Sequence, residues 1–308
     1  MIATINIIRA NNVLMGTVCV LFATLGLSLK AIFIKMVYLQ DPTIDAVSIL
    51  ALRFVMAMPF FLLLLTIAPE PKQAIRFNHS HIIVFALLGM VGFYVSAILD
   101  FSALAYIPAG LERLILFLYP TFVVIISFFI RPEEVTKNII IALVVSYLGV
   151  LVVFIDQAPQ LTDDTLKGII MVLGAAIVFA AYTVASVKHI KQHGAIRFTT
   201  YAMIAATIMT LMHAFYAHGL DFFTQSLTVY SIILLMALFS TVLPLILMAE
   251  GVRRIGASKS SIISTSGPVI TIALAILLLD EAFGIVQAIG AAMIIMGVFL
   301  VSKKKKPA

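Results

Sequence analysis

The chain has 308 residues, of which 63% are hydrophobic and only 11% are charged, and its mean hydropathy is +1.17. Soluble domains contain about 45–50% apolar and about 25% charged residues, so this composition excludes a sizeable soluble domain and with it a nucleotide-hydrolysing or nucleic-acid-binding module. The formal net charge of +6 therefore needs an explanation at a membrane. The single cysteine, Cys19, cannot form an intrachain disulfide.

Ten unbroken apolar segments predict an all-α, polytopic membrane protein with ten transmembrane helices. A span needs about 20 apolar residues, and its backbone groups must pair within the segment, which favours helices; the non-alternating pattern disfavours a barrel. The segments are 13–36, 46–67, 82–104, 109–130, 136–155, 166–187, 197–217, 229–249, 257–279 and 283–301. The first segment lacks a small-x-small cleavage site after it, so we expect an uncleaved helix rather than a signal peptide.

The Lys and Arg residues of the short loops predict that both termini are cytoplasmic. If loops are assigned alternately to the two sides, only Lys35 and Lys167 fall opposite the termini. Fifteen lie on the side of the termini: Arg9, Lys72, Arg76, Arg131, Lys137, Lys188, Lys191, Arg197, Arg253, Arg254, Lys259, Lys303, Lys304, Lys305 and Lys306. The positive-inside rule then gives a multi-pass protein with both termini cytoplasmic and the terminal lysines near anionic lipid headgroups.

An internal repeat is visible when residues 103–153 are aligned without gaps on residues 251–301, an offset of 148. The matched pairs are Ile107 with Ile255, Ala109 with Ala257, Pro120 with Pro268, Glu133 with Glu281, and Gly149 with Gly297. We therefore expect a first five-helix repeat at 1–156 and a second at 157–308. Because five is odd, the second repeat enters the membrane upside down, which is the architecture of alternating-access carriers.

Five charged residues lie inside the predicted spans of the first half, namely Lys30, Arg53, Asp100, Glu112 and Arg113. At 1.5 Å per residue, all five lie roughly 5–10 Å below the non-cytoplasmic face. A charge in mid-membrane costs about 2.5–3.5 kcal/mol on insertion scales, so we expect Arg53 and Lys30 to face Asp100 and Glu112 in an ionic layer. For Lys30 and Arg113, snorkelling to the interface is an equal alternative. Asp100 or Glu112 is the expected coupling group if transport uses protons.

The corresponding place in the second half, expected near the cytoplasmic face, carries charged residues followed by hydroxyl groups. Lys259, Ser261 and Ser264 belong to a polar stretch that ends at Pro268, and its hydroxyls would either line a solute path or bond to neighbouring helices. Pro120 and Pro268 are each expected near the middle of a helix, where a proline removes a backbone hydrogen bond and breaks or bends the helix.

Aromatic residues are a further set that would shape a central cavity, in particular Tyr94, Tyr119 and Tyr182. With 22 Phe and nine Tyr in the chain, packing is the competing interpretation for each of them.

Several kinds of chemistry have no signature in the sequence. There is no phosphate-binding loop and no Gly-x-Ser-x-Gly nucleophile motif, and the pairs His79–His81 and His189–His193 have no carboxylate at ligand spacing. We therefore expect no metal, no cofactor, no nucleic-acid partner and no direct use of ATP. An integral-membrane enzyme with Asp100 and Glu112 as an acid–base pair is the rival from another class.

Together these motifs resemble the EamA branch of the drug/metabolite transporter superfamily. The resemblance covers essentially the whole chain and rests on Ala51-Leu52-Arg53-Phe54, on the stretch from Leu99 to Arg113, on Tyr119-Pro120 and on Asp280-Glu281. It implies a monomeric inner-membrane carrier whose relatives export amino acids or move nucleotide sugars, phosphorylated sugars or drugs. It also implies that Asp100, Glu112, Tyr119, Ser261 and Ser264 lie near the path.

One departure limits what the resemblance implies. Small four-helix relatives use a first-helix glutamate for proton-coupled cation export, whereas the first helix here carries Lys30. We therefore expect a secondary carrier that exports small metabolites, amino acids or related compounds. If transport is coupled to protons, a group other than the first-helix residue carries them. A nucleotide, nucleoside or drug carrier of the same fold is the alternative.

Overall fold

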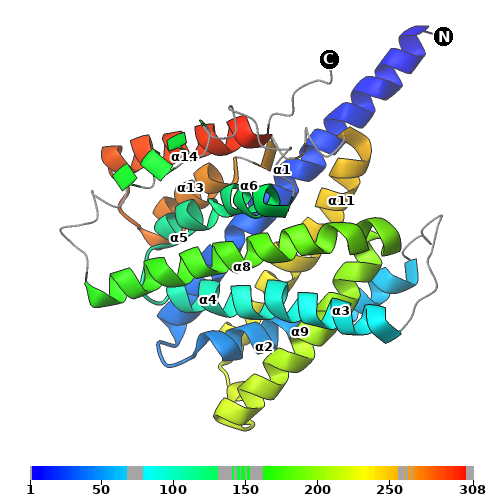
Figure 1. The fold of residues 1–308 in the computed structure, drawn as a ribbon. Coiled ribbons are helices and arrows are strands. Elements are labelled where there is room, and N and C mark those ends of the chain that lie inside the picture. The colour runs from blue at the N-terminus through cyan, green and yellow to red at the C-terminus, as the bar shows by residue number, and fades with distance from the viewer. Residues whose placement is uncertain are drawn as a thin grey trace.

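The computed structural model describes residues 2–67, 79–130, 162–255 and 266–302, with shorter pieces at 141, 144–145, 147–149, 151–152, 260 and 263–264. Within these residues all regular elements are helical (Figure 1). In chain order they are α1 (Ile2–Gln40), α2 (Ala46–Ile67), α3 (His79–Gly89), η1 (Met90–Val95), α4 (Ser96–Ala103), α5 (Ala109–Leu116), α6 (Tyr119–Ile130), α8 (Asp163–His193), α9 (Ala195–His218), η4 (Asp221–Phe223), α10 (Leu227–Ala237), η5 (Leu238–Val242), α11 (Leu243–Ile255), α13 (Gly267–Leu279) and α14 (Ile285–Ser302). The all-α expectation is confirmed for the described chain.

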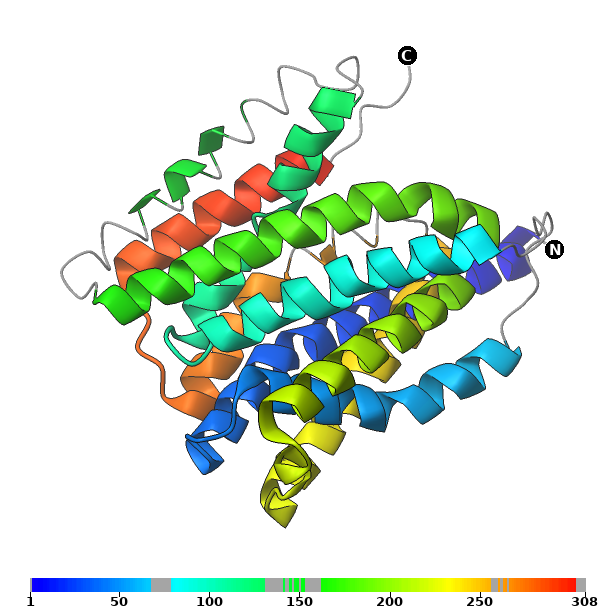
Figure 2. The same ribbon diagram turned by 60° about the horizontal axis from the view of Figure 1, so that its bottom comes forward.

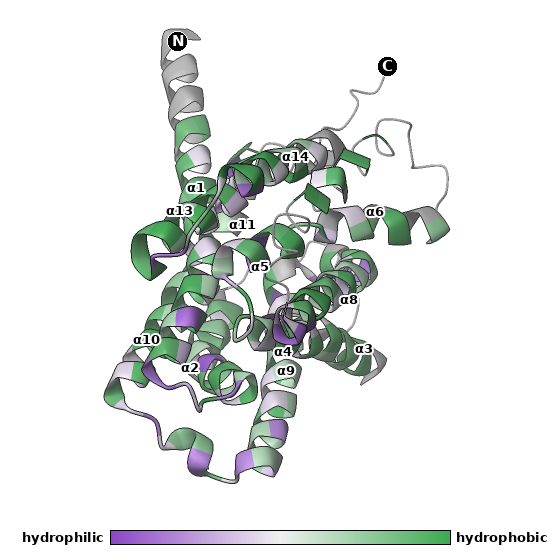
Figure 3. Ribbon diagram, turned by 90° about the vertical axis from the view of Figure 1, so that its left-hand side faces the viewer, coloured by the Kyte–Doolittle hydropathy of each residue, from purple (hydrophilic) through white to green (hydrophobic). Residues whose placement is uncertain are grey.

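Six helical stretches are long and apolar enough to cross a membrane. They are Val13–Gln40, Ala46–Thr66, His81–Ala103, Asp163–Ile190, Ile196–His218 and Leu227–Met248, and shorter apolar helices follow at Gly267–Leu279 and Ile285–Gly297. Figure 3 shows hydrophobic residues along most of the helical length, as lipid contact requires. A polytopic helical membrane protein is thus confirmed. The predicted span 136–155 lies mostly outside the described residues, so the total of ten remains a prediction.

The third and eighth predicted spans each contain a π-helix, which the sequence did not predict. The π-helix η1 begins at Met90 and η5 begins at Leu238, which are 148 residues apart, the offset of the sequence repeat. A hydroxyl bonds to the backbone in each: Ser96 Oγ donates to the carbonyl oxygen of Gly92 (2.5 Å), and Ser240 Oγ donates to that of Met236 (2.7 Å). Such wide turns are common at functional sites.

The two repeat-related prolines begin helices rather than lying in the middle of one. Pro120 is the second residue of α6 and Pro268 the second residue of α13, positions where the missing N–H has no helical acceptor to satisfy. The turn before each proline is the same. Leu118 donates its N–H to the Ile115 carbonyl oxygen (3.0 Å), and the equivalent Ser266 donates to Ile263 (3.1 Å).

Several of the main helix contacts recur when the halves are exchanged. Helix α1 packs against η5 and α11, and α8 packs in the same way against η1 and α4. The pair α3–α9 corresponds to α10–α2, and the contact between α2 and α9 joins two equivalent elements directly. In Figures 1 and 2, α1 and α8 run in opposite directions across the molecule.

Two glycines allow close approaches between the π-helices and the opposite half. A Cβ at Gly26 of α1 would lie 2.4 Å from the carbonyl oxygen of Phe239 in η5, and a Cβ at Gly92 of η1 would lie 2.3 Å from the ring of Tyr182 in α8. Only a residue without a side chain fits at either position. Both π-helices are therefore in tight contact with the first helix of the opposite half.

Candidate functional site

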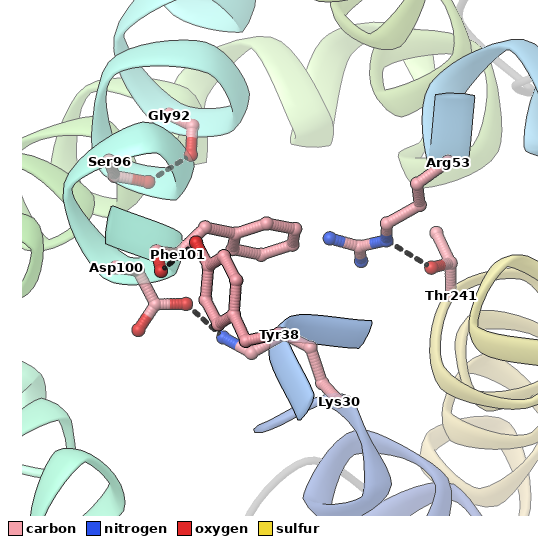
Figure 4. Close-up of polar contacts among 8 residues, drawn as sticks. All are labelled: Lys30, Tyr38, Arg53, Gly92, Ser96, Asp100, Phe101 and Thr241. Atoms are coloured by element: carbon pink, nitrogen blue, oxygen red, sulfur yellow. Dashed lines mark hydrogen bonds and ion pairs between the residues drawn. The ribbon is translucent and has the colours of Figure 1, made fainter. Parts of the chain in front are cut away.

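An ion pair joins the first and third predicted spans of the first half. Lys30 extends from α1 and Asp100 from α4, and the Lys30 ammonium group pairs with Oδ2 of Asp100 (Figure 4). The two side chains are only 16% and 5% exposed. The Lys30 side chain is therefore buried in an ion pair and does not extend to the membrane interface.

Arg53 differs from the expected arrangement because it does not pair with either acid. It projects from α2, and its Nε donates a hydrogen bond to Thr241 Oγ1 in η5 of the second half (2.9 Å). Among the described residues no carboxylate lies within 4 Å of its guanidinium group. The physical reason is that the nearer acid, Asp100, already holds Lys30, while Arg53 reaches across to the other half.

The ring of Phe101 lies close to both Lys30 and Arg53. The guanidinium carbon of Arg53 lies 5.3 Å from the ring centre and the Lys30 ammonium nitrogen lies 5.9 Å from it. Phe101 is completely buried, and its carbonyl oxygen accepts a hydrogen bond from the Tyr38 hydroxyl (2.8 Å), which fixes α4 to the end of α1. Cation–π attraction to one ring thus helps hold both positive groups in place.

A second carboxyl group, Glu112, lies in the first turn of α5 and is completely buried. Its electrostatic neighbours are Asp100, Lys30 and Arg113. Neither oxygen of Glu112 accepts a hydrogen bond from a donor in the described chain, and the same holds for Oδ1 of Asp100. Adjacent carboxyl groups satisfy each other when one of them is protonated and donates to the other, so the pair is chemically suited to carrying a proton.

Arg113 connects this cluster to the second half. Its terminal nitrogen lies against the start of α13, 3.1 Å from where a Cβ of Gly267 would be. Ser28 of α1 bonds the same place, donating to the Gly267 carbonyl oxygen (3.1 Å). Tyr119 is an electrostatic neighbour of Arg113, and its ring packs edge-on against Phe179 with centroids 5.3 Å apart.

The other two tyrosines lie away from the charges. The Tyr94 hydroxyl hydrogen-bonds to Nδ1 of His213 on α9 (2.8 Å). Tyr182 is buried among aromatic rings, including Phe93, Phe179 and Phe198, and fills the contact with η1. Packing is the role that these contacts give to Tyr182.

In the second half, Ser264 and Pro268 are described, and Lys259 and Ser261 lie outside the described residues. The Ser264 hydroxyl donates to the carbonyl oxygen of Ser260 in its own segment (2.9 Å) and lies 4.0 Å from the sulfur of Met248. Pro268 is buried at the first turn of α13. The Ser264 hydroxyl is therefore committed to local bonds.

Two polar contacts between the halves were not anticipated. Thr241 gave no signal in the sequence, because its role depends on the π-helix and on a partner 188 residues away. The sequence identifies Glu281 as a match to Glu133 and as part of the Asp280-Glu281 motif, but it does not predict that the Glu281 carboxylate accepts the N–H groups of Ala109 (2.7 Å) and Gly110 (3.1 Å) and so caps α5. The matched order of proline, acid and glycine in the repeat, at Pro268, Glu281 and Gly297, was the available clue for Glu281.

Comparison with known proteins shows which family and which relatives this chain is similar to. The model of the EamA-like transporter family matches residues 14–155 and again residues 166–303. "Uncharacterized transporter YcbK" of Bacillus subtilis (strain 168) is 30% identical over 292 residues, covering 93% of this chain and 91% of that protein. "Uncharacterized transporter YyaM" of the same organism is 28% identical over 257 residues, with 82% and 83% covered. A solved structure titled "Crystal structure of protein" matches with a TM-score of 0.60 and 15% identity, covering 95% of this chain and 97% of that chain, and this likeness concerns the fold alone.

Proposed function

This chain belongs to the EamA-like transporter family, and on that premise we propose that it is a secondary carrier that moves small metabolites, amino acids or related compounds, outward across a bacterial-type inner membrane. Membership makes it a membrane transporter rather than an enzyme. The observation that carries the finer proposal is the cluster of buried charges of both signs where the two halves meet. Burying such charges is costly in lipid, which favours a role in binding or coupling.

Alternating access between residues 1–156 and 157–308 is the proposed mechanism. It is supported by the two separate matches to one family model, by π-helices and helix-starting prolines at the same offset, and by helix contacts that keep their pattern on exchange of the halves. Two units of this kind, inserted in opposite directions with cytoplasmic termini, can expose one central site to either side in turn. The proposed working unit is a monomer.

Within the site we propose that Asp100 and Glu112 carry the coupling proton. The two carboxyl groups are buried neighbours, and three of their four oxygens accept no hydrogen bond from the described chain. Lys30 and Arg113 balance their charge when both are ionised. Protonation of one carboxyl would change this balance and thereby couple proton movement to the arrangement of α1, α4 and α5.

Reconstitution in liposomes tests the carrier proposal directly. The purified protein is expected to exchange internal for external radiolabelled compound in a panel of amino acids and nucleosides, with and without a pH gradient. Movement of unchanged amino acids supports the proposal, whereas exchange confined to nucleosides or chemical turnover of a lipid contradicts it. Arg53→Met should lower exchange strongly and Arg53→Lys should retain part, so equal activity of the two would remove Arg53 from the path.

A further inference from the structure

We infer that Arg53 binds a carboxylate of the transported compound, held in place for this by Thr241 of the opposite half. The inference rests on the proposed carrier function and specifies the substrate as a compound bearing one carboxylate. It starts from the charges of the cluster. Three cations, Lys30, Arg53 and Arg113, accompany two carboxyl groups, Asp100 and Glu112.

The charge balance leaves Arg53 as the cation without an acid of its own. Lys30 forms the ion pair with Asp100. Arg113 makes no ion pair within 4 Å in the described chain, but it follows Glu112 in sequence and is an electrostatic neighbour of it, so we assign these two charges to each other. Asp100 also acts on Arg53, but no carboxylate in the described chain lies within 4 Å of the guanidinium group. One uncompensated positive charge in a membrane interior is expected to attract one negative charge from a ligand.

The hydrogen bonds of Arg53 leave its two terminal nitrogens available. Its Nε is used by Thr241, whereas neither terminal nitrogen bonds to a group in the described chain. Arg53 is 9% exposed, and its two terminal nitrogens are not among the fully buried polar atoms that lack a partner. The small exposed part of the side chain therefore includes its tip. Two parallel N–H groups at the tip of a guanidinium group match the two oxygens of a carboxylate.

The surroundings hold the guanidinium group in a fixed orientation. Thr241 Oγ1 donates to the Met236 carbonyl oxygen (3.3 Å) while it accepts from Arg53, so its position is set by η5. The ring of Phe101 lies beside the guanidinium group, with its centre 5.3 Å from the guanidinium carbon (Figure 4). The Arg53 guanidinium group contacts Phe101 of the first half and Thr241 of the second half. A relative movement of the two halves would therefore change its position.

A carboxylate fits this charge balance better than a phosphate ester does. A phosphate monoester carries about −1.5 to −2 charges at pH 7, which exceeds the one positive charge left over when Asp100 and Glu112 are both ionised. A carboxylate carries one. A compound with an ammonium group but no carboxylate would add a further positive charge beside Arg53.

The test compares compounds that share a carbon skeleton and differ in charge. Thermal stabilisation of the purified carrier is measured with each natural amino acid, with its deaminated acid, with its decarboxylated amine and with its amide, and with glucose 6-phosphate. The same compounds are then tried in liposome exchange. We expect the stabilising compounds to carry a carboxylate, and we expect Arg53→Gln to weaken their binding by about 10- to 100-fold.

Variants separate binding from folding. Arg53→Lys keeps the charge and loses the paired N–H groups, so its loss should be intermediate. Thr241→Val should also weaken carboxylate binding and Thr241→Ser should restore it, which a purely structural role for the methyl group would not produce. Arg254→Gln is the matched control, because Arg254 bonds to Glu250 on its own helix (2.6 Å) and lies outside the cluster.

The outcomes separate this inference from the proposed function. Stabilisation and exchange by amines, amides or glucose 6-phosphate alone would overturn the carboxylate inference and leave a carrier. Equal carboxylate affinity in wild type and Arg53→Gln would also overturn it. Absence of both stabilisation and exchange across the panel would overturn the carrier proposal together with the inference.

Discussion

Lys30 and Asp100 depend on each other because each would be costly to bury alone. Removing one partner of a buried ion pair leaves an uncompensated charge, with a typical penalty of about 3–5 kcal/mol, whereas removing both can be nearly neutral. We therefore expect Lys30→Met and Asp100→Asn each to lower the free energy of unfolding more than the double variant does. Denaturant unfolding in detergent measures this, and additive losses would show that the pair is not coupled.

Glu112 is the residue on which proton coupling depends most directly. Glu112→Gln keeps the shape of the side chain but removes the exchangeable acid proton. We expect the variant to retain exchange of substrate across the membrane while losing accumulation driven by a pH gradient. Asp164→Asn, at the exposed start of α8, is the control and should accumulate substrate like the wild type. Unchanged accumulation by Glu112→Gln would exclude Glu112 as the coupling group.

At the scale of elements, the contact between η1 and α8 depends on the absence of a side chain at Gly92. Gly92→Ala would place a methyl group 2.3 Å from the Tyr182 ring, and overpacking of this kind typically costs about 1–3 kcal/mol. Replacing the ring as well, in Gly92→Ala with Tyr182→Val, should recover part of the loss. Thermal unfolding of the two variants measures the recovery, and a double variant less stable than Gly92→Ala would contradict this packing.

The helices themselves were predictable, since apolar runs of the right length leave the backbone little choice but to bond within each segment. The π-helices were not, because a five-residue turn has no composition signal in one sequence. The breaks before Pro120 and Pro268 were foreseen as disruptions but placed in mid-helix, because a proline at the first turn and one in the interior look alike without the neighbouring hydrogen bonds.

The site was predictable in its members but only partly in its pairings. The buried charges of the first half were identifiable because charge in an apolar run is conspicuous. Which cation pairs with Asp100 depends on how α1, α2 and α4 cross, and in the structure it is Lys30. Arg53 instead donates a hydrogen bond to Thr241 in the other half. Tyr182 is an example of a residue whose packing role depends on Gly92, 90 positions away in the chain.

At the scale of the whole molecule, opposed orientation of the halves predicts which loops face the outside. The single cysteine makes this measurable, since Cys19→Ser gives a background without thiols. Thr43→Cys, between α1 and α2, should react with a membrane-impermeant maleimide in intact cells, whereas Lys188→Cys, near the end of α8, should react only after permeabilisation. Labelling of both in intact cells, or the reverse order, would contradict the proposed topology.

The wide turns of η1 and η5 bear on the history of the chain. A π-helix arises when one residue is added to a regular helix, and two independent additions at positions 148 apart would be a coincidence. If the two halves descend from one duplicated gene, that added residue was already present in the ancestor, a single five-helix protein that had to pair with an inverted copy of itself. The π-helix of this ancestor would then have packed against the first helix of the second copy. In the present chain η1 packs against α8 and η5 packs against α1 in the same way.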